Sequence, residues 1–199
     1  MKTIAVLVLM FVCLLDLSRA NAQDTTRGTE TIVGWFSDFG FQKLPEVVQW
    51  IRRLDAEWEK LVLDEQRAQI LRQVKQIAST TAELELGCVK SVSLLHSGND
   101  VIPEIETLEE TVFQLRERMT RLSTDLGGDV GKDGLDIANN FESFMRARSG
   151  LLSEARQRLS ANRPDDRAAA GDYLTKAAVL ARNAHEAIVL FIKGHALRK

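Results

Sequence analysis

Apolar residues recur every three or four positions over most of the chain, which is the spacing of one face of an α-helix. Glutamates crowd the start of the clearest such run and arginines follow later, an order that suits the helix dipole. No run of alternating apolar and polar residues, typical of a β-strand, interrupts the pattern. The sequence therefore predicts an all-α protein. The clearest run has no gaps: Ile105, Leu108, Val112, Leu115, Met119, Leu122 and Leu126.

Prolines and glycines divide the chain into four helical stretches. Pro45, Pro103 and Pro164 each stand just ahead of an apolar run, where the fixed φ of proline suits a first helical turn. Residues 127–134 contain four glycines, so we expect a flexible, solvated loop there. Short connections favour antiparallel neighbours. We predict an up-and-down antiparallel bundle of about four helices over residues 45–199, with a fifth helix or an elongated form as variants and a two-subunit coiled coil as the alternative.

The first helical stretch, residues 45–96, is too long for one straight helix of such a bundle. Its apolar positions follow one heptad spacing from Val47 and a shifted one from Ile70 onward. A continuous helix of this length would reach about 78 Å. We expect two pieces or a bend, with the break near Thr80-Thr81 or at Gly87, where the residues are poor helix formers.

The first 22 residues have the pattern of a cleaved signal peptide. A short basic start precedes the uncharged apolar run 4–15, and Ala20-Asn21-Ala22 offers small residues at the cleavage position. Twelve apolar residues span about 18 Å as a helix, against about 30 Å for the hydrocarbon core of a bilayer. A signal peptide is therefore favoured over a membrane anchor. We expect export to a bacterial periplasm or to the extracellular space.

Residues 23–44 differ from the helical stretches, because a polar start leads into an aromatic-rich amphipathic segment. This apolar face either packs on the chain's own bundle or docks to a partner or a membrane surface, since exposed apolar patches mark interfaces. Its aromatic residues are the predicted candidates for partner binding: Trp35, Phe36, Phe39 and Phe41.

Charge and cysteine content narrow the possible functions. Loss of Lys2, Asp16 and Arg19 with the signal peptide leaves 24 basic and 27 acidic residues, a net charge of −3. That balance argues against nucleic acid and against a strongly anionic membrane as partners. Cys88 is the one cysteine that remains, so an intrachain disulfide cannot form. Its place on an apolar stripe predicts a buried thiol, with an intermolecular disulfide as the alternative.

Motifs for catalysis or metal binding are incomplete. Asp129 and Asp133 reproduce the opening spacing of a calcium loop, but Asn140 stands where the closing bidentate glutamate belongs. Motifs for covalent haem and for a nucleophilic serine are missing. We therefore expect no catalytic residue, no bound metal and no cofactor. The histidines fit no ligand motif and are expected on helix surfaces: His96, His185 and His195.

These features together favour an exported, non-enzymatic helical-bundle protein that acts through its helix faces. It would bind a protein partner or associate with itself. The alternative is a bundle that binds a lipid or a small apolar ligand, with peripheral membrane contact. Periodicity does not separate the two, because a buried stripe and a ligand-lined stripe have the same spacing.

Overall fold

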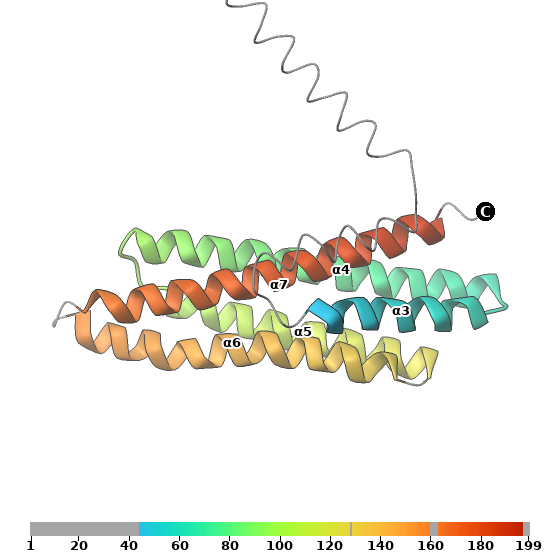
Figure 1. The fold of residues 1–199 in the computed structure, drawn as a ribbon, viewed down its shortest axis with the longest axis horizontal. Helices are drawn as coiled ribbons and strands as arrows, with labels where there is room; N and C mark the ends of the chain where they lie inside the picture. Colours follow the sequence, from blue (N-terminus) through green and yellow to red (C-terminus); the bar gives the residue numbers. More distant parts are fainter. Residues whose placement is uncertain (1–43, 128, 160–162, 197–199) are drawn as a thin grey trace, which may run out of the picture. The chain divides into compact units, whose positions relative to one another are not determined.

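The predicted all-α architecture is confirmed by the computed structural model, which describes residues 44–127, 129–159 and 163–196. These residues form helices and no β-strand (Figure 1). The predicted signal peptide and the four aromatic candidates lie outside the described residues. The helices are α3 (Leu44–Lys60), α4 (Asp64–His96), α5 (Ile102–Leu126), α6 (Val130–Arg158) and α7 (Pro164–Ala196).

Polar contacts between helices show that α4 to α7 run up and down around a shared core. On α4 and α7, Glu85 pairs with Arg182 at 2.7 Å, and the carbonyl of Ala78 lies 2.9 Å from His185 Nδ1. The earlier α4 residue meets the later α7 residue, so these two helices are antiparallel. The bundle that the sequence predicts is therefore present. Contacts also join the other neighbours: Arg118 to Gln76 (α5–α4), Arg116 to Glu142 (α5–α6) and Arg148 to Tyr173 (α6–α7).

Helix α3 adds a fifth helix to one half of the bundle, where it lies between α6 and α7 (Figure 1). Asn140 donates to Glu46 at 2.7 Å, and Arg53 pairs with Asp133 at 3.0 Å, so α3 runs antiparallel to α6. The buried ring of Trp58 packs on the last turns of α7. Of the described helices, five build the core of this half and four build the core of the other half.

The break in the long first stretch lies at residues 61–63, and the expectation of a break near Thr80-Thr81 or at Gly87 is wrong. The hydroxyls of Thr80 and Thr81 each donate to the carbonyl four residues earlier, at 3.0 and 3.1 Å, so their polar groups are satisfied within α4. A Cβ added at Gly87 would lie 2.6 Å from Leu108 Cδ2. This glycine therefore allows a close approach of α5 and does not break the helix.

Residues 130–134 belong to α6, so the expectation of a solvated loop over 127–134 is also wrong. Gly131 and Gly134 are buried. An added Cβ at Gly134 would lie 3.3 Å from Trp50 Nε1 of α3 and 3.2 Å from Met119 Sδ of α5. Of the three described glycines in this stretch, only Gly127 has the turn conformation, with φ at 66° at the end of α5. Gly131 and Gly134 therefore allow helices to pack closely. In the sequence, glycines with this role cannot be told apart from the glycines of a loop.

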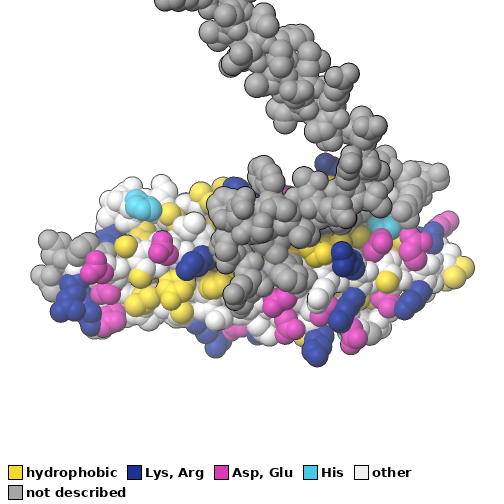
Figure 2. All heavy atoms as spheres, in the orientation of Figure 1, with side chains coloured by type: hydrophobic (Ala, Val, Ile, Leu, Met, Phe, Trp, Pro, Cys, Tyr) yellow, Lys and Arg dark blue, Asp and Glu magenta, His cyan; other side chains and the backbone are white. Residues whose placement is uncertain are grey.

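The apolar stripe predicted for residues 105–126 is confirmed, since its residues from Ile105 to Leu122 are buried and Leu115 is fully enclosed. On the face shown in Figure 2, acidic and basic side chains interleave along the edge of the bundle. No helix among the described residues combines the length and the apolar content that crossing a membrane requires.

Candidate functional site

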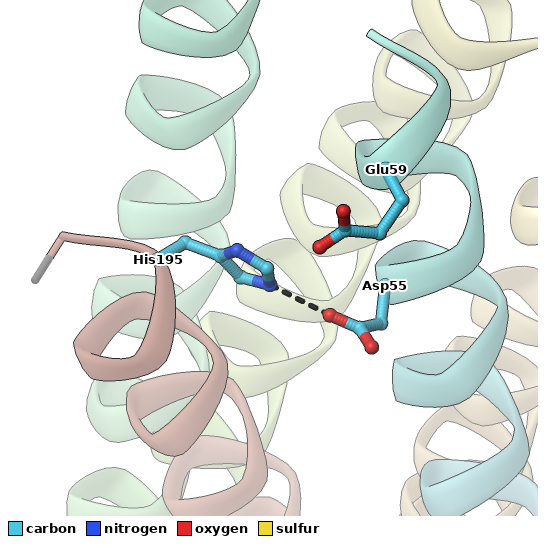
Figure 3. Close-up of side chains that lie close together, drawn as sticks. All are labelled: Asp55, Glu59 and His195. Atoms are coloured by element: carbon cyan, nitrogen blue, oxygen red, sulfur yellow. Dashed lines mark hydrogen bonds and ion pairs between the residues drawn. The ribbon is translucent and has the colours of Figure 1, made fainter. Parts of the chain in front are cut away.

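Three side chains with metal-ligand chemistry meet at one end of the bundle (Figure 3). Asp55 and Glu59 stand one turn apart on α3, and His195 comes from the last turn of α7. One potential ligand atom of each lies within 4.8 Å of the other two. The side chain of His195 is only 4% exposed, and its Nε2 lies 2.7 Å from Asp55 Oδ1. The prediction from the sequence that His195 lies on a helix surface is therefore wrong.

Aromatic rings hold the His195 imidazole in place. The ring centroids of Trp58 and Phe191 lie 4.8 and 4.4 Å from that of His195. Among the described residues, His195 Nδ1 has no hydrogen-bond partner. A proton on Nε2 can be donated to Asp55, whereas a proton on Nδ1 would be a buried donor without an acceptor, at a cost of about 1–3 kcal/mol. The geometry therefore favours the tautomer with the proton on Nε2.

That tautomer favours a contact between helices over a metal centre. A cation on Nε2 would move the imidazole proton to Nδ1, and metal-bound histidines normally donate this second N–H to an acceptor. His195 Nδ1 has none among the described residues. We therefore interpret Asp55 and His195 as a clamp that joins the end of α3 to the end of α7.

A second polar group lies in the core, where Arg148 of α6 is fully buried. Its guanidinium carbon lies 3.4 Å from the ring centroid of Tyr173 on α7, and its Nη1 donates to the carbonyl of Phe144 at 2.8 Å. Its Nε and Nη2 have no partner within the described part of the chain. Burial lowers the pKa of Arg148 to about 10, so the side chain stays charged at neutral pH.

Cys88, the one cysteine among the described residues, lies near this arginine. Cys88 is a free thiol and is fully buried, which confirms the predicted buried state. Burial raises its pKa to about 12, and the charge of Arg148 offsets only part of that rise. A thiol that keeps its proton is a poor nucleophile and a poor metal ligand. A disulfide to another chain would require the bundle to open.

The two candidate calcium ligands face an arginine. Arg53 of α3 lies 3.6 Å from Asp129 Oδ2 and 3.0 Å from Asp133 Oδ2, the second contact being an ion pair without hydrogen-bond geometry. Asp129 precedes α6, and Asp133 lies in its first turn. The chain from Val130 to Asn140 is helical, whereas a calcium loop must wrap its ligands around the ion. The structure thus places these carboxylates as partners of Arg53 at a helix start, where negative charge is favourable.

The clearest surface feature is an apolar patch on the outer side of α4. Leu86 is 71% exposed and Val89 is 48% exposed, one turn apart in the C-terminal half of this helix. These two residues lie outside the apolar stripe of α4 that includes Leu84 and Cys88. The sequence did not lead us to predict them as a binding surface. Their signal was present, because apolar residues outside the helical period are candidates for a second contact surface. Uncharged residues continue this side of the helix at Ser79, Ala82 and Ser93, whereas Glu83 and Lys90 stand within one turn of Leu86.

A groove of about 420 Å³ lies beside this patch, between α4 and α5. Gly87 and Leu108 contribute its apolar part. Glu83 and Lys90 stand on α4 on either side of Gly87, and neither forms an ion pair with another described residue. We call Leu86, Val89 and this groove the α4–α5 surface.

No protein-family model, no curated protein and no solved structure matches this chain.

Proposed function

We propose that this chain is an exported, non-enzymatic protein that works by binding another protein chain through the α4–α5 surface. The observation that carries this proposal is the exposure of Leu86, a large apolar side chain that is 71% exposed although it lies well inside a long helix. Burial of a leucine side chain stabilises by about 1.5–3 kcal/mol relative to exposure in water. Apolar surface with a polar rim is a common mark of protein interfaces.

The charges around the patch favour a protein partner over a lipid surface. Glu83 and Glu104 line the groove together with Lys90, so both signs are present. A helix face that binds a membrane is broader, and its polar side is rich in lysine and arginine. The slightly acidic balance of the chain points the same way, because it gives no attraction to anionic lipids.

The unusual side chains of the core support a binding role more than a catalytic one. Cys88 keeps its proton, and Arg148 is enclosed between α6 and α7. His195 is held by Asp55 and by two aromatic rings. Each of these groups is engaged in packing within the bundle. The aromatic candidates Trp35, Phe36, Phe39 and Phe41 remain predicted contributors to partner binding, and export remains part of the proposal.

The test is site-specific photo-crosslinking in cells that express the full chain. A photoreactive residue replaces Leu86 in one variant and Asp136 in the control. Asp136 is exposed on α6, a helix that is not a neighbour of α4 in the bundle. We expect position 86 to yield a crosslinked protein, identified by its peptides, and position 136 to yield none. Equal yields at the two positions would contradict the proposal. Native mass spectrometry that shows a retained lipid would instead favour the ligand-binding alternative.

A further inference from the structure

We propose that the partner is a second copy of this chain, with two α4 helices packed antiparallel about a twofold axis between Leu86 and Gly87. This inference rests on the proposed function, because it uses the same α4–α5 surface. In such a pair, the numbers of two facing residues sum to 173, since Leu86 of one copy faces Gly87 of the other. Every contact then occurs twice, as in any twofold interface.

The shape of the surface suits this arrangement. Gly87 has no side chain, and the groove beside it is about 420 Å³ in volume. The direction in which a Cβ of Gly87 would point is already filled by Leu108, which makes the groove floor apolar. Leu86 projects from the neighbouring position and is 71% exposed. One copy therefore offers both a projecting leucine and, in the groove between α4 and α5, a hollow with an apolar floor that can receive one.

The charges select the antiparallel orientation. The residue numbers of Glu83 and Lys90 also add up to 173, so Glu83 of each copy would face Lys90 of the other. One such pair would lie on each side of the Leu86–Gly87 contacts. Neither side chain forms an ion pair within the described residues of its own chain. A parallel pair in register would instead set Glu83 against Glu83 and Lys90 against Lys90. Like charges placed face to face destabilise an interface, so the charge order favours the antiparallel pair.

Facing positions farther from the axis are compatible with this register. Ser79 would face Leu94, and Gln76 would face Ser97. Neither pairing sets like charges against each other. Residues 79–94 span about 24 Å of helix, so the contact is shorter than a standard interface. We therefore expect a reversible dimer with a dissociation constant in the micromolar range.

A charge-exchange cycle tests the register. The exported protein and its variants are compared by sedimentation velocity over a range of concentrations. We expect Glu83→Lys and Lys90→Glu each to weaken association by at least about tenfold, because each places like charges together twice. The double variant E83K/K90E should recover most of the affinity, since the opposite charges face each other again. Asp136→Lys on α6 is the control and should leave association unchanged.

Leu86→Asp tests the apolar contact without touching the core. We expect a monomer at every concentration, with an unchanged melting temperature because residue 86 is exposed. A dimer that survives Leu86→Asp, or a double charge variant that stays as weak as the singles, overturns this arrangement. A wild-type protein that is always monomeric overturns the inference too. If position 86 still crosslinks to another protein, the proposed function stands, and if it crosslinks to nothing, both fail.

Discussion

Arg148 lies stacked on Tyr173 in the interior of the bundle, with its guanidinium carbon 3.4 Å from the ring centroid. The ring face, one backbone carbonyl and the nearby charge of Asp172 all favour the charged guanidinium. A cation over an aromatic ring gains on the order of 2 kcal/mol when desolvated. Removal of a charged group from water costs several kcal/mol, so the contact offsets only part of the burial.

Arg148→Met should stabilise the protein, because a neutral side chain of similar length fills the same space without the cost of desolvation. We expect the free energy of unfolding to rise by at least about 1 kcal/mol, and Tyr173→Leu to lower it by about 1–2 kcal/mol. Urea denaturation measures both. Arg146→Met is the control, since its side chain is 74% exposed on the same helix and should change little. A loss of stability in Arg148→Met would show that the arginine is a net stabiliser.

The contact between Asp55 and His195 should stabilise the end of the bundle where α3 meets α7. We expect Asp55→Asn to cost about 1 kcal/mol, and His195→Ala to cost more because ring packing is lost as well. His195→Phe separates the two effects, since it keeps the aromatic packing and removes the hydrogen bond. Thermal melts with and without one equivalent of Zn²⁺ complete the test. A zinc-dependent rise in melting temperature that Glu59→Gln abolishes would show a metal site where we infer a clamp.

Cys88 should be unreactive in the folded protein. Burial raises its pKa from an ordinary 9.0 to about 12, so the folded chain holds the thiol proton where the unfolded chain has released it. The resulting contribution to stability is complete below pH 9 and is lost as pH rises toward 12. We expect a thiol reagent at pH 8 to label the native protein far more slowly than the urea-unfolded protein. Equal rates would place Cys88 at the surface.

Gly87→Ala and Gly150→Ala should change stability in opposite directions. A Cβ at position 87 would lie 2.6 Å from Leu108 Cδ2, and relief of this clash costs about 1–3 kcal/mol. Position 150 lies within α6 with no atom within 4 Å of an added Cβ, so alanine should stabilise by about 0.5–1 kcal/mol. Differential scanning calorimetry of the two variants decides the matter. The same sign for both would contradict the role of close packing at Gly87.

The aromatic candidates of residues 23–44 can be tested by Trp35→Ala combined with Phe36→Ala. We expect the more frequent arrangement, internal packing, in which the melting temperature falls by several degrees while association is unchanged. Docking to a partner predicts the reverse, with unchanged stability and a smaller complex in size-exclusion chromatography. A variant with unchanged stability, association and membrane retention would remove these aromatics from both roles.

The amino-acid sequence by itself determined the helical class, the buried stripe of residues 105–122 and the burial of Cys88. These features depend on local periodicity, because residues three and four apart share one face of a helix wherever that helix packs. The glycines of the sequence also predicted a helix boundary after residue 126, and α5 ends there, just before Gly127. The sequence further required a break in residues 45–96, since one unbroken helix would exceed the length of its neighbours.

Only the tertiary structure decided which positions outside that period are buried or exposed. Arg148 is accepted in the core because Tyr173, distant in sequence, supplies a ring face. His195 is buried because α3 reaches the last turn of α7, and the break falls at residues 61–63 because α3 then reverses into α4. Leu86 stays exposed because no helix of the described chain covers the outer side of α4. Such outcomes depend on which neighbour fills a given volume, and local periodicity carries no information about that neighbour.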